Sequence, residues 1–420
     1  MSIARPASSS TPQTGGPLTE RRYIAPFALI TSLFFLWAVG VNLNDILIPH
    51  LKGAFHLTDF ESSFVQVAFF GGYCLAAWPA GRIMERIGYQ RGIVCGLLIC
   101  ATGAFLFIPA AAAGTYWFFL LALFIMACGQ SFLEVSSNPY VTFLGPPSSA
   151  ERRLNLAQSF NAVGAVVTPI FGSALILSRA HSAHSETDVV RLPYLLIVGI
   201  FLIMAFMIWS AKLPVIQEES AEEESPRFSG IFAFPHLLKG VAAQFCYVGA
   251  QVGVASFVIR YVQHTQPGTL DTVAANYLKL HLVGFMAGRF AGSALMKKIR
   301  PAHLLAAFAA GCLVSVLPII FLHGPLALAG IVLLGFFHSI MFPTIFALSI
   351  RHLGPYTKRG SSLEVMAILG GAIFPAIMGK ISDASDIQHA FFIPLACYIV
   401  VLYFATKGYK VKAVVAERRV

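Results

Sequence analysis

Charged residues are scarce in this sequence: Asp, Glu, Lys and Arg make up 11% of its 420 residues, whereas 57% are hydrophobic. A soluble domain of this length needs more charge to keep its surface hydrated, so the composition excludes an ordinary soluble protein. The mean hydropathy of +0.74 agrees. We therefore expect an all-α membrane protein whose surface mostly faces lipid.

The chain also lacks the residue patterns of several function classes. Its seven cysteines all fall in apolar stretches, with no metal-ligand spacing and no disulfide framework. No nucleophile–base set and no phosphate-binding loop is recognisable, so we expect no enzyme, no metal and no cofactor. The first 20 residues are polar and rich in Ser, Thr and Pro, which predicts a disordered tail rather than a secretory signal peptide.

Long apolar runs are abundant instead. A helix that crosses the bilayer takes about 20 mainly apolar residues, and the sequence has room for twelve of them. The runs predict six spans in a first half, near 24–48, 62–84, 91–112, 116–143, 153–178 and 191–211. Six more lie in a second half, near 236–262, 272–296, 301–322, 325–350, 359–383 and 388–407.

The basic residues identify one side of the membrane. They gather on alternate connections, starting with Arg21 and Arg22, and the opposite connections carry only scattered charge. Cytoplasmic connections carry the Lys/Arg excess, so both termini should be cytoplasmic in a bacterial inner membrane. The net charge of +10 is then an orientation signal, and a nucleic-acid partner is not expected. We expect a monomer in contact with membrane lipid.

These observations predict five regions. A disordered cytoplasmic tail over 1–22 precedes a six-helix bundle over 23–211. A cytoplasmic acidic linker over 212–235 leads to a second six-helix bundle over 236–409, and 410–420 form a cytoplasmic tail.

An internal repeat relates the two halves. Arg152 and Arg153 precede Gln158 by six and five residues, and Gly164 and Pro169 follow it by six and eleven. The second half repeats this spacing around Glu364, with Lys358, Arg359, Gly370 and Pro375. Two pseudo-symmetric bundles are thus expected, with Gln158 and Glu364 at equivalent positions and a substrate site where the repeats meet.

The connection after the second span carries a motif, Gly81-Arg-Ile-Met-Glu85-Arg86-Ile-Gly88-Tyr-Gln-Arg91. It resembles the signature loop of the major facilitator superfamily, in which a glycine permits close helix contact and an acid–arginine set latches the cytoplasmic ends. An ordinary positive-inside loop is the alternative interpretation. The candidate gating residues are Gly81, Glu85, Arg86, Gly88 and Arg91.

Two acids stand inside predicted spans, where a charged group costs at least ~2.5–3.5 kcal/mol and marks a functional site by default. Glu134 lies deep in the fourth span, and taking up a proton would remove the cost of its charge. Asp45 lies nearer the outer end of the first span. Both are candidate proton-coupling residues. A hydrogen-bonded structural glutamate and a plain helix-end acid are the alternatives.

Other ionisable residues also lie in predicted spans. Arg289 on the eighth span either holds a carboxylate or sugar hydroxyls, or extends towards the membrane surface. His338 is either a satisfied interior histidine or a proton relay. Lys279, unusual on the same span as Arg289, suggests a buried partner, and Glu364 is one candidate for it.

Neutral polar and aromatic side chains complete the candidate sugar site. Amides bind sugar hydroxyl groups, and aromatic rings pack against the C–H faces of the sugar. Amide side chains also commonly form hydrogen bonds that stabilise helix packing in membranes, so some of these residues are expected to be structural. The candidates are Asn42, Asn44, Gln158, Asn161 and Gln251, with Trp37 and Tyr247.

Several longer segments resemble the L-fucose–proton symporter family, which includes glucose/galactose permeases. They include LNDILIPHL, LEVSSNPYVTFLGP, RLNLAQSFNAVGA, QFCYVGAQVGVASFVIRYV and FPTIFALSIRHLG. The resemblance implies proton-coupled monosaccharide uptake by alternating access. It also implies coupling roles for Asp45 and Glu134, and sugar-site roles for Arg289, Gln158 and Asn161. Lys279, Glu364, Ala255 and Phe342 depart from the family pattern, which leaves the sugar open.

The sequence thus predicts a proton-coupled carrier of a sugar resembling L-fucose, glucose or galactose. Two alternatives use the same fold. A multidrug or organic-ion proton antiporter would favour a broad apolar cavity over several amides, and a sodium-coupled sugar carrier would replace the proton by sodium.

Overall fold

The structure is a computed structural model that describes residues 16–54, 59–180, 188–215 and 228–411. Within these ranges, the side chains of residues 40–41, 43–54, 59–63, 169–180, 188–192 and 228–229 are not described. The parts of the two predicted tails and of the acidic linker at 1–15, 216–227 and 412–420 lie outside the described residues.

Five long helices form the first half of the chain. They are α1 (Ile24–Ala54), α2 (Asp59–Ala113), α3 (Tyr116–Phe143), α4 (Ala150–Ala180) and α5 (Asp188–Ser210). Helix α2 contains the predicted second and third spans, which a break at Gly88 separates. Gly88 has φ +78°, a left-handed conformation that glycine adopts without strain, and this lets the chain turn between the two spans.

The second half is more broken. It contains α6 (Pro235–Thr265), α7 (Asp271–Leu295), α8 (Pro301–Phe321), α9 (Pro325–His338), α10 (Met341–Ser349), α11 (Thr357–Met366), α12 (Gly370–Ala384), α13 (Ile387–Ala390) and α14 (Phe392–Tyr403). Helices α9 and α10 together make the tenth span. Helices α11 and α12, joined by the 3₁₀ turn η5 (Ala367–Leu369), make the eleventh, and α13, α14 and the π-helical turn η6 (Phe404–Gly408) make the twelfth.

The described helices supply the twelve predicted crossings. Nine segments are long and apolar enough to cross a membrane by length and composition, and the one over Phe64–Ala113 contains two spans. The remaining two crossings are the more polar α4 and α7. Their lower hydropathy has a structural reason, because these two helices pack against each other where the halves meet.

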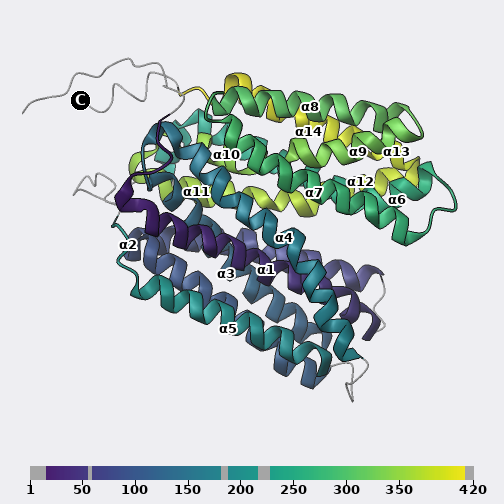
Figure 1. Ribbon diagram of the computed structural model, residues 1–420, viewed down its shortest axis with the longest axis horizontal. Helices are drawn as coiled ribbons and strands as arrows, with labels where there is room; N and C mark the ends of the chain where they lie inside the picture. The colour runs from purple at the N-terminus through teal and green to yellow at the C-terminus, as the bar shows by residue number, and fades with distance from the viewer. Residues whose placement is uncertain (1–15, 55–58, 181–187, 216–227, 412–420) are drawn as a thin grey trace, which may run out of the picture.

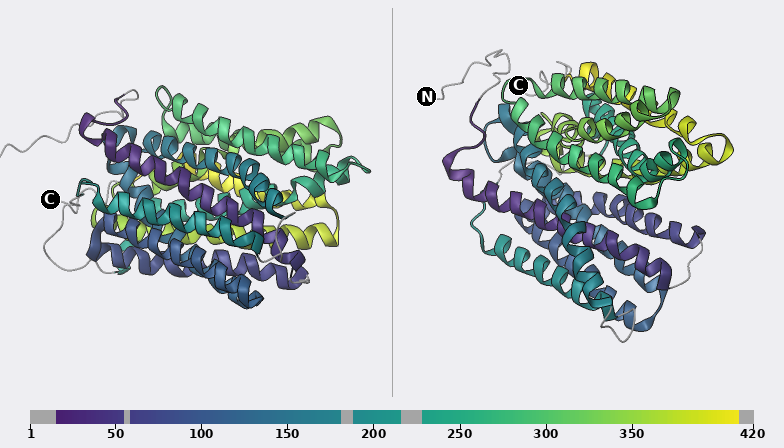
Figure 2. Two further views of the ribbon diagram at one scale, coloured as in Figure 1. Left: turned by 60° about the horizontal axis from the view of Figure 1, so that its bottom comes forward. Right: turned by 45° about the vertical axis from the view of Figure 1, so that its right-hand side comes forward.

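The two halves form two bundles side by side. Helices α1 to α5, purple to teal in Figure 1, gather on one side of the molecule, and α6 to α14, green to yellow, gather on the other. The views in Figure 2 keep this division. Helix α4 packs on α7 and α10, and α2 packs on α11, so these helices join the bundles.

Arg153 anchors the start of α4 inside the first bundle. Its side chain is fully buried and donates hydrogen bonds to backbone oxygens at the end of α3, including that of Val141 (3.2 Å). It also donates to the backbone oxygen of Leu18 (2.9 Å), and Thr19 Oγ1 donates to the oxygen of Leu144 (2.6 Å). Residues 16–20, predicted as part of a disordered tail, therefore dock onto the bundle, because Arg153 needs oxygen partners that α3 alone does not supply.

The close approach of α2 and α3 in the first bundle can be tested by mutation. A methyl group added at Gly103 of α2 would lie 2.5 Å from the backbone nitrogen of Met126 of α3, so one helix has to shift. We expect Gly103→Ala to lower the free energy of unfolding by ~1–3 kcal/mol, measured by thermal unfolding in detergent.

Gly71→Ala is the matched control on the same helix. Nothing lies within 4 Å of a methyl group at Gly71, so this variant should be neutral or slightly more stable, because alanine is the better helix former. Equal stability of the two variants would contradict the packing described here.

Candidate functional site

A series of hydrogen bonds connects buried polar residues at the centre of the molecule. Glu134 and Asn138 lie one turn apart on α3, so their side chains share a face, and Asn138 Nδ2 donates to Glu134 Oε2. Asn138 Oδ1 in turn accepts from Gln158 Nε2 of α4 at 3.0 Å. All three side chains are at least nine-tenths buried, with Glu134 only 9% exposed.

Arg289 of α7 extends this series across the two halves. Its Nη1 donates to the backbone oxygen and to the side-chain Oε1 of Gln158, at 2.5 and 2.9 Å. Its Nε donates to the backbone oxygen of Ser339 in the second half at 3.1 Å. Donors run in one direction, from the guanidinium through two amides to the carboxyl group of Glu134. A buried cation in one half is thus connected to a buried acid in the other.

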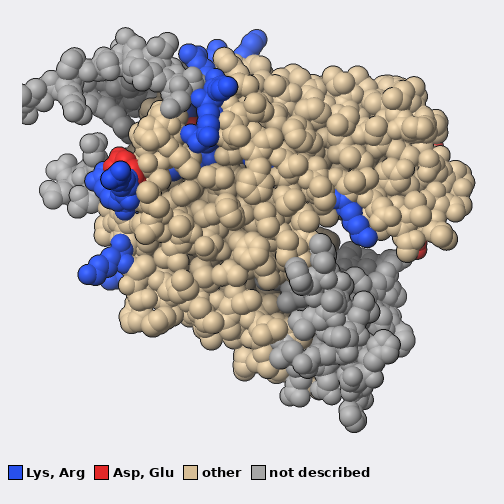
Figure 3. All heavy atoms as spheres, in the orientation of Figure 1, with Lys and Arg blue, Asp and Glu red and all other residues tan. Residues whose placement is uncertain are grey.

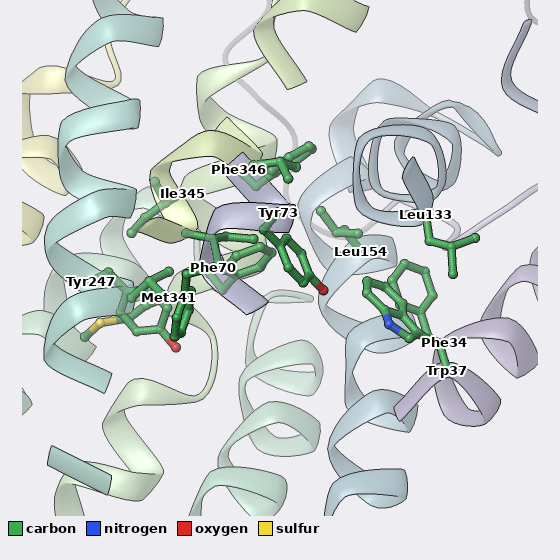
Figure 4. Close-up of a cluster of buried hydrophobic side chains, with 14 of the residues drawn as sticks. Phe34, Trp37, Phe70, Tyr73, Leu133, Leu154, Tyr247, Met341, Ile345 and Phe346 are labelled. Carbon is green, nitrogen blue, oxygen red and sulfur yellow. The ribbon is translucent and has the colours of Figure 1, made fainter. Parts of the chain in front are cut away.

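Aromatic and aliphatic side chains surround this polar series. In Figure 4, Phe70 and Tyr73 of α2 lie between Tyr247, Met341, Ile345 and Phe346 of the second half and Leu133, Leu154, Phe34 and Trp37 of the first. Tyr73 donates its hydroxyl hydrogen to Gln130 Oε1 at 3.0 Å. The apolar surroundings keep the dielectric constant low and strengthen the polar contacts.

A second set of contacts joins the halves at one end of the molecule. Arg359 at the start of α11 binds Glu85 of α2 with two hydrogen bonds, Nε to Oε1 at 2.6 Å and Nη2 to Oε2 at 3.2 Å. The arginine side chain is 6% exposed and the glutamate 21%. One turn before Glu85 on α2, Gly81 lies directly against Ser362 of α11, and any larger side chain at position 81 would collide with Ser362.

Glu151 and Asn155 of α4 add two further links at the same end. Glu151 pairs with Arg351, which follows α10, at 2.5 Å, and its own side chain is fully buried. Asn155 Nδ2 donates to Thr344 Oγ1 of α10 at 3.0 Å. Together with the Glu85–Arg359 pair, these contacts close this end of the interface between the halves.

This end of the molecule also carries most of the basic residues. On the face drawn in Figure 3, Lys and Arg side chains gather at the left, and the rest of the described surface is nearly free of charge. We call this the basic end; it contains Arg82, Arg86, Arg91, Lys297, Lys298 and Arg300.

The sequence anticipated only part of this closure. The predicted loop residues Gly81 and Glu85 take part in it, whereas Gly88 forms the turn of α2, and the arginine that binds Glu85 is Arg359 of the second half. Glu151 and Asn155 were missed. Their only sequence signal is their position beside Arg152 and Arg153, where a charged residue looks like an ordinary loop end.

Several other predicted residues lie on α1, α4 and α6. Asn161 Nδ2 donates to the backbone oxygen of Phe34 of α1 at 3.3 Å, and Asn42 Nδ2 donates to Ala38 within α1 at 2.8 Å. Trp37 is buried beside Phe34, with ring centroids 5.8 Å apart. Gln251 of α6 is half-buried. Asn44 and Asp45 belong to α1, but their side chains lie outside the described ones.

His338 and Glu364 lie inside the second bundle instead. His338 Nε2 is 2.7 Å from the hydroxyl oxygen of Tyr398, and its backbone oxygen accepts a hydrogen bond from Tyr247 at 2.9 Å. Glu364 is fully buried on α11. Lys279 is exposed on α7 and contacts Asn276 at 3.4 Å. Glu364, one candidate partner of Lys279, is therefore not its partner, because the Lys279 side chain is exposed and that of Glu364 is enclosed by helices.

Comparisons with known proteins agree with this architecture. The family model of the Major Facilitator Superfamily matches residues 29–363. The chain belongs to this superfamily. It is 43% identical over 415 residues to the L-fucose-proton symporter of Escherichia coli, covering 92% of this chain and 93% of the relative. It is also 41% identical over 395 residues to the glucose/galactose transporter of Brucella abortus, covering 93% and 96%.

A solved structure supports the same assignment. The crystal structure of the major facilitator superfamily transporter FucP in the outward conformation superimposes with a TM-score of 0.86 at 43% identity, covering 92% of this chain and 99% of that one. The expected family and the fold of twelve helices in two bundles are therefore confirmed. The relatives are transporters, which confirms the expectation of a multi-pass membrane carrier rather than an enzyme.

The closure at the basic end predicts a measurable shift in conformation. Glu85→Gln removes the charge that holds Arg359 and, because the pair is partly exposed, should weaken the closed form by ~1–2 kcal/mol. That corresponds to a roughly five- to thirtyfold change in the ratio of open to closed protein. We expect a cysteine introduced by Ser362→Cys to react faster with a thiol reagent in the Glu85→Gln protein than in protein that keeps Glu85. Labelling is measured against protein without the introduced cysteine.

Asp383→Asn is the control, because the Asp383–Arg260 pair at 3.7 Å is exposed and lies within the second half. Labelling that stays as slow in Glu85→Gln as in Asp383→Asn would show that the Glu85–Arg359 pair does not hold the halves together.

Proposed function

We propose that this protein is a proton-coupled monosaccharide symporter that works by alternating access, with a substrate resembling L-fucose, glucose or galactose. The observation that carries the proposal is the buried series from Arg289 through Gln158 and Asn138 to Glu134. It places an acid that can bind a proton in direct connection with a contact between the two halves.

Glu134 is the proposed proton carrier. A carboxylate in an apolar membrane interior is expensive, and protonation removes that expense. In the charged form, Glu134 accepts the hydrogen bond of Asn138 and stands at the acceptor end of the series. Loss of its charge weakens the electrostatic pull along the two amides towards Arg289, and with it the bond between the halves. Protonation then makes rearrangement of the interface easier.

The amides at the interface suit a sugar ligand. Gln158, Asn138 and Asn161 offer donors and acceptors that sugar hydroxyl groups match, and Trp37 supplies an aromatic face at the same level of the first bundle. Binding energy from such contacts can replace the Arg289–Gln158 bonds when the halves move. The two relatives named above, an L-fucose-proton symporter and a glucose/galactose transporter, support this substrate class.

The closure at the basic end fits one stage of such a cycle. Glu85–Arg359 and Glu151–Arg351 hold the halves together there, and the similar FucP structure has the outward conformation. We assign the basic end to the cytoplasm of a bacterial inner membrane, because Lys and Arg accumulate in cytoplasmic connections. Both termini are then cytoplasmic. The carrier acts as a monomer in lipid, since each step uses residues of one chain.

The five regions predicted from the sequence fit the same scheme. The two bundles at 23–211 and 236–409 move against each other, and the linker at 212–235 joins them on the cytoplasmic side. A drug or organic-ion antiporter is the weaker alternative, because the centre of the interface is lined by amides and a fixed guanidinium rather than by a broad apolar surface.

The decisive test separates exchange from accumulation. In proteoliposomes, Glu134→Gln mimics the protonated acid, so counterflow of labelled sugar should persist while accumulation driven by a pH gradient should fall to the equilibrated level. A panel of monosaccharides in a thermal-shift assay on purified protein first identifies the sugar. Accumulation at the wild-type level in Glu134→Gln would exclude Glu134 as the coupling residue.

Glu20→Gln provides the control, because Glu20 is exposed and pairs with Arg22 at 2.8 Å outside the membrane-spanning helices. Replacing sodium in the buffers tests the sodium-coupled alternative. We expect uptake by the wild type to follow the pH gradient with or without sodium. Uptake that requires sodium and ignores the pH gradient would favour that alternative.

A further inference from the structure

A row of buried polar residues follows one face of α6, inside the second bundle. His236, Gly240, Gln244 and Tyr247 succeed each other at intervals of three or four residues, so they lie along a single face of the helix. His236 is at the first turn, at the basic end, where its Nε2 is 2.9 Å from the backbone oxygen of Arg351. We call this row the α6 polar face.

Buried atoms along this face lack protein partners. Within the described part of the chain, His236 Nδ1 and both side-chain polar atoms of Gln244 make no hydrogen bond. The side chains of His236 and Gln244 are 1% and 0% exposed. Buried polar atoms without protein partners normally bind ordered water, because leaving them unsatisfied is costly. The α6 polar face therefore offers positions at which ordered water can bind.

Glu364 of α11 lies against this face. A methyl group on Gly240 would collide with Ser349 Oγ of α10 and would lie 2.9 Å from Glu364 Oε1, so both oxygens share the small space left by the glycine. Glu364 is 0% exposed, and neither carboxyl oxygen has a hydrogen bond of normal geometry to a described residue.

The hydroxyl group of Ser349 indicates the protonation state of its neighbour. Ser349 donates its own hydrogen to the backbone oxygen of Ile345 at 2.8 Å, so towards Glu364 it can only accept. A hydrogen bond between the two side chains then requires the carboxyl group to supply the hydrogen. In this conformation, the surroundings of Glu364 suit the neutral acid.

No cation on the packed elements is available to neutralise Glu364 in the described structure. The two arginines bind acids of the first half, Arg359 to Glu85 and Arg351 to Glu151. The two lysines lie over aromatic rings, Lys358 over Tyr89 and Lys239 over Tyr403. Of the other titratable groups, Glu134 accepts a hydrogen bond from Asn138, and His236 contacts the backbone oxygen of Arg351.

We propose that Glu364 is a second proton-exchanging carboxyl group, buried in the second half and reached from the basic end along the α6 polar face. The inference rests on the proposed proton-coupled transport. Glu364 lies five residues beyond Arg359 on α11. Release of the Glu85–Arg359 pair frees this part of α11 from α2 and opens the path from His236 to Glu364, so the proton leaves towards the basic end.

Two measurements on the full-length carrier test the proposal. The first is the proton-to-sugar ratio in proteoliposomes, read from the pH gradient and membrane potential at which net sugar flux vanishes. We expect the ratio to fall by about one proton in Glu364→Gln, because an amide cannot bind and release a proton as the carboxyl group does. Asp383→Asn, an exposed acid-to-amide change on the neighbouring α12, should leave the ratio unchanged.

The second measurement is infrared spectroscopy of purified protein in light and heavy water. The wild type should show a protonated carboxylic acid band that disappears in Glu364→Gln. His236→Leu keeps the acid but removes the polar side chain between Gly240 and the basic end, so the band should persist while its shift in heavy water becomes slower. This arm does not depend on transport, and Glu364→Asp, which keeps an acid but shifts its band, assigns the band if Glu364→Gln fails to fold.

An unchanged proton-to-sugar ratio in Glu364→Gln overturns the proposal, as does an exchange rate that His236→Leu leaves unaltered. A wild-type protein that moves sugar without protons would instead refute the proposed function. The infrared arm would then still report whether Glu364 exchanges its proton through the α6 polar face.

Discussion

The guanidinium group of Arg289 is the interaction on which the centre of this carrier depends. It is a permanent charge placed where hydrocarbon and apolar side chains exclude water, so it requires oxygen partners within the protein. The structure supplies them from both halves, with Ser339 on its own side and Gln158 on the other. The guanidinium group thereby holds the two bundles together, and because its charge is permanent it requires hydrogen-bond acceptors in every conformation. Any rearrangement has to provide Arg289 with substitutes, which a ligand rich in hydroxyl groups can do.

The remaining contacts between the halves are arranged around this constraint. Polar links lie at the basic end, where Glu85, Glu151 and Asn155 each bind a residue of the second half. Apolar contacts between Phe70 and Gly371, and between the rings of Phe160 and Phe290, lie nearer the middle. Glu85 remains 21% exposed, and solvent reduces the net contribution of its pair with Arg359. A set of modest contacts suits a carrier, because alternating conformations must remain within a few kcal/mol of each other.

Much of the architecture follows from the sequence, because a chain that spans a bilayer must place apolar residues in its helices and charged residues in its connections. Apolar length and charge placement are local properties, so the spans and the pseudo-repeat around Gln158 are visible without coordinates. Glu134 and Arg289 stand out for the same reason, as ionisable groups in apolar runs. The hydrogen-bond partners of these two residues, however, depend on helices that are distant in the sequence. Lys279 illustrates this: its unusual place in a span suggested a buried partner, yet its side chain is on an exposed face of α7.

The same limit explains the residues that were missed. Glu151 is one of several charges near a predicted cytoplasmic loop, and only the approach of α10 gives it Arg351 as a partner. The unpartnered atoms of His236 and Gln244 have no sequence signature, because whether a polar atom is satisfied depends on three helices at once.

Arg153 and Arg359 occupy equivalent positions in the internal repeat, and the structure gives them opposite tasks. Arg153 is saturated by oxygens of its own half and of the docked residues before α1, so nothing in a transport cycle needs to loosen it. Arg359 binds across the interface and must let go whenever the basic end opens. The repeat thus contains one copy of the arginine bound within its own half and one bound across the interface. The same side chain therefore serves as an anchor within one half and as a link between the halves in the other.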